Sequence, residues 1–315
     1  MTIWGFPMFE RTAVEAEAVG KVHELIAMAN AFGFDRGRLA TALPRSWVHD
    51  VYSKLETLPD GIDKQAGRRA LEKLKRALVR CAATYDRNVP WLQNALRAQA
   101  AGNVEHIVAA EPESDSVPDF WSYIASLQPA HSQLVSHDIS GFSSVCRRLL
   151  ECASRAVIVD PYFDLMLPRC HSLFTEMIAW GHLGKCVEFD VYCRAEEVLP
   201  KKDNSVQLFE KSVAKTLNAA KMTKSLTVRM HLLDDKKAPI APMHLRALIT
   251  ELGGISIDYG FRLEQGRQSP VVVLAGDSLE TLRRYFYDGQ HPYAYAERPF
   301  VWERRTDDLS ADMSR

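Results

Sequence analysis

The chain of 315 residues is long enough for two domains, and 47% hydrophobic with 25% charged residues is the composition of an ordinary globular protein. Lys and Arg number 39 against 40 Asp and Glu, so the net charge of the whole chain gives no argument for a polyanionic partner. The six cysteines lack close pairs, the start lacks a signal-peptide pattern, and no apolar run approaches the ~20 residues that cross a bilayer. The sequence therefore predicts a cytoplasmic protein with no metal, cofactor or membrane partner.

The first third of the chain is predicted to be helical. Apolar residues recur at the spacing of one helix face in residues 12–32 and 63–85, and further helices are expected at 44–58 and 89–101. Residues 111–119 are acidic and contain two prolines, which is typical of a linker. We therefore expect four parts: a helical N-terminal domain (1–110), a linker (111–139), an α/β domain (140–305) and a flexible tail (306–315).

The second half of the chain alternates between two kinds of pattern. Short β-branched runs predict buried strands at 156–160, 187–193 and 226–233, and the first of them is stopped by Pro161. Helical segments lie between these runs, and residues 245–259 are expected to form a hairpin. This alternation predicts an α/β fold with a mixed, partly parallel sheet.

The segment 243–261 carries the strongest candidate for chemistry. If residues 244–250 are extended, alternation places His244, Arg246 and Thr250 on one face and Leu245, Ala247 and Ile249 on the other. An imidazole can act as a nucleophile or an acid–base group, and a guanidinium can hold phosphoryl oxygens through two hydrogen bonds. We interpret the pair as a phosphate site. The alternative is a His and an Arg that pair with nearby acids and bind no ligand.

The same segment resembles the signature of the phospholipase D superfamily. That signature is His-x-Lys-x4-Asp followed by a Gly-Ser or Gly-Thr step, and this chain has His244-x-Arg246-x4-Glu251, a glycine turn and a strand that ends at Gly260. Residues 158–163 are similar to the first strand of such lobes. The resemblance covers about half of the chain. It departs from the signature at Arg246, at Glu251 and at Phe261, which stands where a Ser or Thr is usual.

This resemblance implies a metal-independent phosphodiesterase, similar to a nuclease. His244, Arg246 and Glu251 would be catalytic, and the substrate would be bound by Thr250, Asp160, Tyr162, Gly260 and Glu264. Asp160 ends a predicted strand, where α/β sheets place ligand groups, although a turn stabilising the Pro161 bend explains it equally well. Gly260 allows a backbone to approach a ligand closely, and Glu251 and Glu264 could orient His244, although a glutamate on a hairpin turn is more often simply solvated.

Phospholipase D-like enzymes use two histidines, and no second His-x-Lys or His-x-Arg is present. The resemblance therefore implies either a homodimer that pairs two copies of His244 or a lobe that binds without catalysis, as a subunit of a larger complex. Bacterial proteins of this kind with a helical front half suggest, by analogy alone, a role in defence against phage.

A basic stripe on the third predicted helix is the local argument for nucleic acid. Positive side chains along it could each neutralise one phosphate, although charged helix faces are usually just solvated. The candidate contacts are Arg68, Arg69, Lys73, Arg76 and Arg80. No glycine-rich phosphate loop of the GxGxxG or Walker type is present, which disfavours those nucleotide-binding folds.

Overall fold

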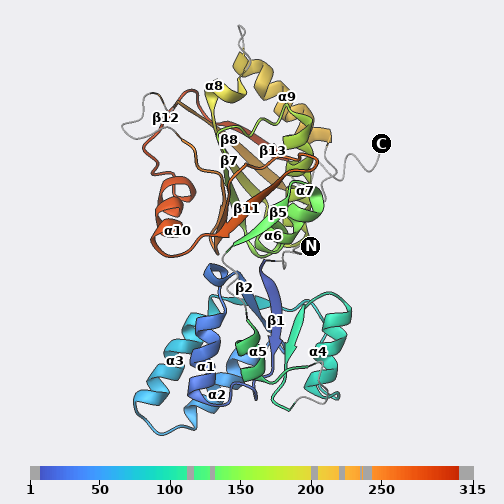
Figure 1. Ribbon diagram of the computed structural model, residues 1–315, viewed down its shortest axis with the longest axis vertical. Coiled ribbons are helices and arrows are strands. Elements are labelled where there is room, and N and C mark those ends of the chain that lie inside the picture. Colours follow the sequence, from blue (N-terminus) through green and yellow to red (C-terminus); the bar gives the residue numbers. More distant parts are fainter. Residues whose placement is uncertain are drawn as a thin grey trace. The chain divides into compact units, whose positions relative to one another are not determined.

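A computed structural model of the chain describes residues 8–111, 117–127, 132–199, 205–219, 224–234, 236 and 243–304. Two compact units follow one another (Figure 1): an N-terminal unit from Met8 to His131 and a C-terminal unit from Ser132 onward. Each unit combines helices with a sheet, so the predicted α/β class is confirmed. The division falls inside the segment 111–139 that was predicted to be a linker, and the predicted tail, 306–315, lies outside the described residues.

The N-terminal unit is built on a parallel sheet in the order β3-β2-β1-β4. Its strands are β1 (Glu10–Val14), β2 (Arg38–Ala42), β3 (Leu78–Arg80) and β4 (His106–Val108). Its helices are α1 (Val22–Ala31), α2 (Trp47–Glu56), α3 (Ile62–Lys75), α4 (Trp91–Ala100) and α5 (Phe120–Ser126). One hydrophobic cluster joins the sheet to α1, α2, α3 and α5, and a second joins it to α4, so helices cover both faces.

The prediction of a purely helical N-terminal domain was therefore wrong. The strands escaped detection because they are three to five residues long and hold few large apolar side chains, as in the sequence of β2, Arg-Leu-Ala-Thr-Ala. A parallel strand buried on both faces is normally recognised by a continuous apolar run, and these strands do not contain one. The predicted linker also contains structure, since it includes α5 and the first strand of the C-terminal unit.

The C-terminal unit is built on a mixed sheet in the order β12-β8-β7-β6-β9-β10-β11-β5, and β13 also pairs with β8. Its strands are β5 (Ser132–Ser136), β6 (Arg155–Val159), β7 (Glu188–Arg194), β8 (Leu226–Asp234), β9 (Ala247–Thr250), β10 (Gly254–Ile257), β11 (Gln268–Val273), β12 (Ala294–Tyr295) and β13 (Phe300–Arg304). Its helices are α6 (Ile139–Cys152), α7 (Pro168–Leu183), α8 (Ala195–Val198), α9 (Ser205–Ala219) and α10 (Gly276–Leu282), and α10 continues into a π-helical turn (Arg283–Tyr287). The predicted strands at 156–160, 187–193 and 226–233 and the hairpin correspond to β6, β7, β8 and the β9–β10 pair.

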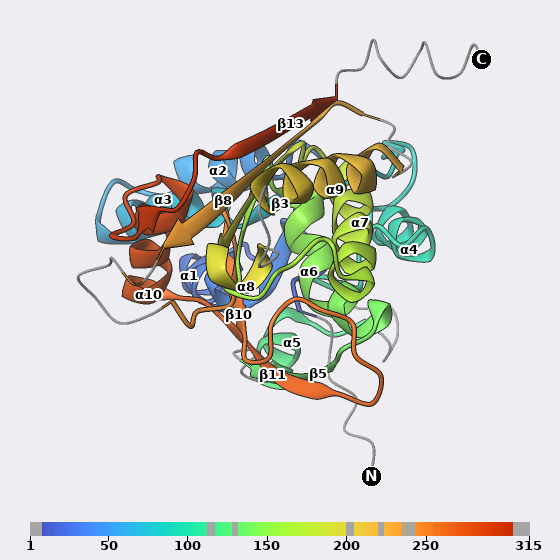
Figure 2. The same ribbon diagram turned by 90° about the horizontal axis from the view of Figure 1, so that it is seen from above.

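Two views agree that α6, α7 and α9 cover one face of this sheet, while α10 lies on the other side (Figures 1 and 2). Strands β6, β7 and β8 are parallel, so their carboxyl ends meet at one edge, which we call the carboxyl edge. Strand β9 runs antiparallel to β6, with Ala247 beside Val159 and Thr250 beside Ala156. The start of β9 therefore lies at the carboxyl edge, and its end lies at the opposite edge, the amino edge. Among the described residues, no helix has both the length and the apolar character to span a bilayer.

Candidate functional site

The chain that leads into β9 alternates as the sequence predicted. Met243, Leu245, Ala247 and Ile249 all belong to one hydrophobic cluster on the α10 side of the sheet. His244 and Arg246 therefore point to the other side. There His244 is exposed to solvent, and 23% of the Arg246 side-chain surface is exposed. Both residues precede the strand, and the amide of Ile257 donates to Arg246 O over 3.0 Å, which extends the β9–β10 pairing back to Arg246. The pair thus emerges at the carboxyl edge.

The guanidinium of Arg246 is held in place by the protein. Its Nη1 donates to the carbonyl of Asp258 over 2.7 Å, and its Nε lies 3.9 Å from Asp160 Oδ1. Its central carbon lies 5.3 Å from the centre of the Tyr162 ring. Nε is buried and has no hydrogen-bond partner. The predicted residues Arg246, Asp160 and Tyr162 are therefore brought together.

Asp160 is a buried carboxylate that closes the end of β6. It is 3% exposed, and it accepts hydrogen bonds from the amide of Tyr162 over 3.0 Å and from the amide of Phe261 over 2.8 Å. Burial raises the pKa of Asp160, and these two amides and then Arg246 oppose that rise. Both oxygens thus have donors within the protein, in agreement with the turn-stabilising interpretation of Asp160. Its carboxylate therefore joins the turn after β6 to the chain at Phe261, beside Arg246.

Gly260 is the glycine that this arrangement requires. Its φ is +92°, and a Cβ there would lie 2.5 Å from Asp160 Oδ2 and 3.1 Å from Arg246 Cδ. The groups that approach Gly260 are two side chains of the protein itself, and its close approach to a ligand stays a prediction.

Glu251 and Thr250 lie at the amino edge, away from His244 and Arg246. The Glu251 carboxylate accepts from the amide of Ser154 over 2.5 Å and from its hydroxyl over 2.8 Å. The Thr250 hydroxyl is fully buried and bonds within the β9–β10 turn. The predictions that Glu251 orients His244 and that Thr250 contacts substrate were therefore wrong. The x4 spacing spans the whole of β9 and carries the acid to the other edge.

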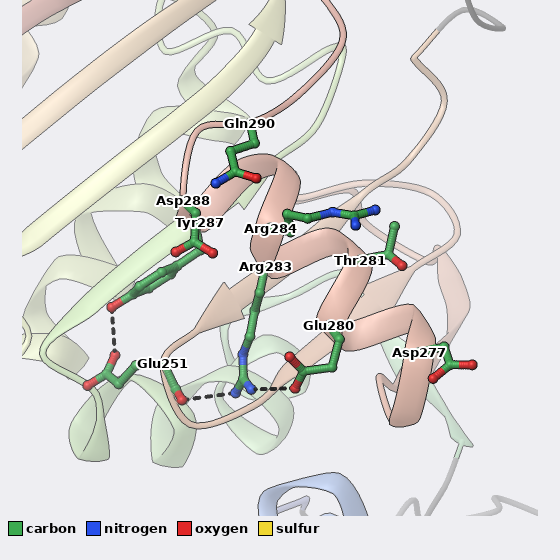
Figure 3. Close-up of a pocket in the computed structure, with 9 residues that line it drawn as sticks. All are labelled: Glu251, Asp277, Glu280, Thr281, Arg283, Arg284, Tyr287, Asp288 and Gln290. Atoms are coloured by element: carbon green, nitrogen blue, oxygen red, sulfur yellow. Dashed lines mark hydrogen bonds and ion pairs between the residues drawn. The ribbon is translucent and has the colours of Figure 1, made fainter.

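A hollow of about 710 Å³ borders Glu251 at the amino edge (Figure 3). Arg283 crosses it, donating to the carbonyl of Glu251 over 2.9 Å and pairing with Glu280 at 3.3 Å. The Tyr287 hydroxyl donates to Glu251 over 3.5 Å, and burial together with the Glu251 charge raises the pKa of Tyr287 to about 12. Arg283 pairs with Glu280, and Glu251 accepts from Ser154 and Tyr287, which suits a structural junction.

Glu264 follows Gly260 in a loop that carries an unpredicted basic cluster. Its carboxylate lies 3.6 Å from Arg262 Nε, so it faces Arg262. The guanidinium carbons of Arg262 and Arg267 lie 4.1 and 3.8 Å from the centre of the Tyr259 ring. Both guanidinium groups therefore lie within cation–π distance of the same ring. In the sequence, this cluster could have been found from Tyr259 and the two arginines that follow Gly260, Arg262 and Arg267.

The predicted basic stripe is partly neutralised within the N-terminal unit. Arg68 makes a two-pronged contact with Glu56, with distances from 2.7 to 3.0 Å. Lys73 donates to Asn30 over 3.0 Å, and Arg80 belongs to β3 and not to the helix. Arg69, Arg76 and Arg80 are exposed and form no ion pair with any described residue. Arg68 thus drops out as a free cation, whereas Arg69 and Arg76 remain available.

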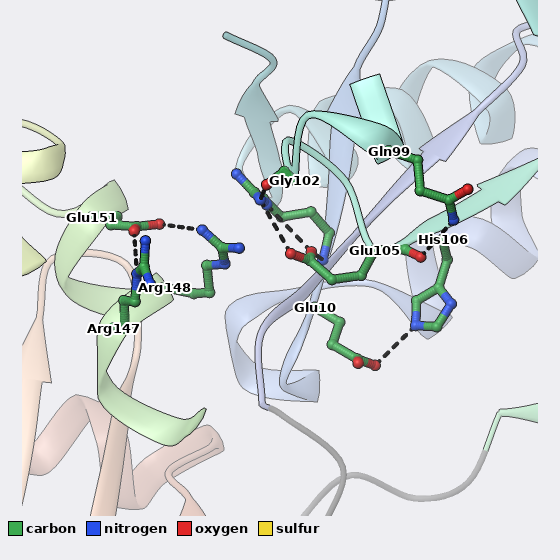
Figure 4. Close-up of polar contacts among 9 residues, drawn as sticks. Glu10, Gln99, Gly102, Glu105, His106, Arg147, Arg148 and Glu151 are labelled. Carbon is green, nitrogen blue, oxygen red and sulfur yellow. Dashed lines mark hydrogen bonds and ion pairs between the residues drawn. The ribbon is translucent and has the colours of Figure 1, made fainter. Parts of the chain in front are cut away.

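Other polar contacts in both units were not anticipated (Figure 4). In the N-terminal unit, His106 Nε2 lies 2.9 Å from Glu10 Oε2 on the neighbouring strand, and this partner raises the pKa of His106. In the C-terminal unit, Glu151 accepts from Arg147 over 2.7 Å and from Arg148 over 2.6 Å. These pairs stabilise strand and helix surfaces. Among the described residues, no group of three or more His, Cys, Asp or Glu side chains is arranged to hold a metal ion.

Comparison with known proteins assigns no family. No family model matches the chain, and no curated protein matches it. Among solved structures, TrmBL2, an archaeal chromatin protein whose structure shows a novel mode of DNA binding, aligns over 79% of this chain and 82% of its own, with 11% identity and a TM-score of 0.26. A similarity that low supports no argument about this protein.

Proposed function

We propose that the C-terminal unit is a phospholipase D-like phosphodiesterase that acts on nucleic acid through His244. The observation that supports it most is the placement of His244 and Arg246. They leave the sheet on one side, at the edge where α/β folds bind ligands, while Met243 and Leu245 anchor the other side in the core. An imidazole and a guanidinium beside one another suit a phosphodiester, which needs a nucleophile and charge stabilisation.

In the proposed reaction, a ring nitrogen of His244 attacks phosphorus and forms a P–N bond as the P–O bond to the leaving alcohol breaks. The departing oxygen takes a proton from a second imidazole. The second imidazole then takes a proton from water as the water oxygen attacks phosphorus, the P–N bond breaks, and both imidazoles are restored. Arg246 stabilises the charge on the phosphoryl oxygens. A homodimer that pairs two copies of His244 would supply the second imidazole.

A second candidate function, a binding subunit without catalysis, is favoured by one observation. No hydrogen bond joins the His244 ring to any residue that the structure describes, and the acid expected to orient it, Glu251, lies at the amino edge. An imidazole without an orienting partner is a weaker nucleophile than one that is held in place. Such a unit would bind phosphodiesters and leave them intact.

The test combines a small and a large substrate. Purified protein is incubated in EDTA with bis(4-nitrophenyl) phosphate, plasmid and single-stranded DNA. Wild type is compared with His244→Ala and with His49→Ala, a control that removes an exposed histidine of the N-terminal unit. We expect a loss of roughly 10³-fold or more in His244→Ala, because the attacking group is gone, and no change in His49→Ala. Wild-type protein that binds DNA but cleaves neither substrate would favour the binding subunit.

Nucleic acid as the substrate is tested separately through the N-terminal unit. Arg69 and Arg76 are exposed cations without ion pairs to described residues. If both contact phosphates, the variant Arg69→Gln/Arg76→Gln should reduce the dependence of log affinity on log salt by about 2 units. Arg68→Gln serves as the control, because Glu56 already occupies that guanidinium. An unchanged slope in the double variant would remove this surface from the proposal.

A further inference from the structure

A hollow of about 920 Å³ in the N-terminal unit opens at the carboxyl ends of β2 and β3. Its walls are the segments that directly follow those strands, residues 42–46 and 81–85, together with Asp50 and Arg87. In open parallel sheets, ligands bind outside the carboxyl ends of the strands, where the connecting segments diverge. The hollow therefore lies where this fold would hold a small molecule, and the proposed phosphodiesterase site has no part in it.

Two arginines of this hollow are available for an anion. Arg45 follows β2 and Arg87 follows β3, both side chains are exposed, and neither forms an ion pair with a described residue. Two guanidinium groups at one opening form strong, directional hydrogen bonds to phosphate oxygens. Phosphate is thus an anion that this pair of residues can bind.

The start of α2 adds to the same opening. Ser46 occupies the position before the helix, but its hydroxyl donates to Asp50 Oδ2 over 3.0 Å and does not cap the first turn. The amide of Trp47 donates to the carbonyl of Pro44 over 3.0 Å, and Ser46 caps none of the amides in the first turn. The positive end of the helix therefore begins directly after Arg45 in the chain.

The remaining walls differ in character. Residues 42–44 and 81–83 supply an apolar surface of alanine, leucine, proline and cysteine side chains. On the same face of the sheet as Leu43, the Thr41 hydroxyl is buried without a hydrogen-bond partner. Acidic groups lie near Tyr85: burial raises the pKa of Tyr85, and the carboxylates of Glu15, Glu17 and Asp50 raise it further. Of these three, Asp50 lines the hollow, in the first turn of α2. An apolar ring and hydroxyl groups would find complementary surfaces here.

We propose that this hollow binds a nucleoside phosphate. The phosphate lies against Arg45 and Arg87 at the start of α2, the base lies on the apolar wall, and the ribose hydroxyls donate to the Asp50 side. A glycine-rich loop is not needed, because two side chains supply the charge that such a loop takes from backbone amides.

The experiment is isothermal titration of the full chain with AMP, adenosine and inorganic phosphate. We expect AMP to bind more tightly than either of its parts. Arg45→Gln and Arg87→Gln should each weaken AMP binding about tenfold or more, since each removes charge-assisted hydrogen bonds. Ala82→Phe, which fills the opening and keeps both charges, should abolish binding. Arg97→Gln, an exposed arginine of α4 outside the hollow, should bind AMP as wild type does.

Three results would overturn the inference: no heat with millimolar AMP, equal affinity for AMP and adenosine, or unchanged affinity in Arg45→Gln and Arg87→Gln. His244→Ala separates this site from the proposed phosphodiesterase site. AMP binding that survives in His244→Ala supports the hollow in the N-terminal unit. AMP binding that vanishes there places the ligand in the C-terminal unit and rejects this inference, whatever the outcome of the cleavage assay.

Discussion

Polar residues of one sequence motif flank the two ends of β9, and they differ in how many protein partners they have. At the carboxyl edge, Arg246 has one hydrogen bond to a carbonyl, a distant contact with Asp160 and an exposed portion. At the amino edge, Glu251 receives donors from Ser154, Arg155 and Tyr287. Five residue-to-residue steps of extended chain lead from Arg246 to Glu251, about 16 Å at the usual rise. The difference shows that one continuous sequence motif can split into a partly exposed part and a part that is bound within the protein.

The two ends also differ in what a substitution should change. The carboxyl edge combines a buried carboxylate, Asp160, with the more exposed His244 and Arg246 of the proposed site. Substitution of Asp160 should therefore change stability, and substitution of His244 or Arg246 should change ligand binding. At the amino edge the Glu251 carboxylate is bound within the protein, so its substitution should change stability alone.

The largest expected effect is on stability, in Asp160→Ala. This change leaves the amides of Tyr162 and Phe261 without their acceptor in a site that is 3% exposed, and it removes the anion beside Arg246. We expect a loss of about 3 kcal/mol in the free energy of unfolding, measured by urea denaturation. Asp164→Ala is the control: it removes one acceptor, that of the Met166 amide, from a half-buried site and should cost about 1 kcal/mol. Equal losses of unfolding free energy in the two variants would mean that Asp160 contributes no more to stability than Asp164 does.

At the amino edge, Glu251→Ala should cost about 2 kcal/mol in unfolding free energy, because the amide and hydroxyl of Ser154 lose their acceptor. The loss is smaller than for Asp160→Ala, since the Ser154 contact is exposed and water can replace part of it. The variant should bind and cleave phosphodiesters as wild type does at temperatures where it is folded. Reduced cleavage by fully folded Glu251→Ala would mean that Glu251 takes part in the proposed site. The contrast between the two ends of β9 would then be wrong.

The sequence correctly predicted which side chains around β9 share a face, but it did not predict where the strand ends. Alternation correctly placed His244 and Arg246 opposite Leu245 and Ala247, because a period of two needs no knowledge of neighbours. It could not show that β9 is only four residues long, since strand length is set by pairing with β6 and β10.

Residues outside the motif were missed for a related reason. Arg262 and Arg267 meet at Tyr259 only because the loop after Gly260 turns back, with the Arg267 amide donating to the Glu264 carbonyl. In the N-terminal unit, short strands of small residues become strands through burial between two helical layers. Their local propensity alone gives a weak signal.

A smaller effect is expected for Arg246→Lys. The lysine keeps the positive charge but cannot reach Asp258 O and a phosphate at once, so we expect about tenfold weaker binding of a phosphodiester, roughly 1.4 kcal/mol. Unfolding free energy should change by less than that, because the guanidinium is partly exposed. The matched change at the amino edge, Arg284→Lys, also alters an arginine over a tyrosine ring and should leave binding unchanged. If both variants bind as wild type does, the site does not use Arg246.

The smallest expected effect is a titration at the amino edge. The pKa of Tyr287 is raised to about 12, first by burial and then by the charge of Glu251, while Arg155 opposes the rise. A raised pKa means that the folded state holds the phenolic proton more tightly than the unfolded state, whose tyrosines titrate near pH 10. The contribution of Tyr287 is therefore fully present below about pH 10 and is lost as pH rises toward 12. Ultraviolet difference absorbance should show that Tyr287 loses its proton at a lower pH in Glu251→Gln than in wild type, because the carboxylate charge is gone and burial remains. An unchanged pKa of Tyr287 in Glu251→Gln would mean that the Glu251 charge does not act on Tyr287. The two residues would then not be electrostatically coupled at the amino edge.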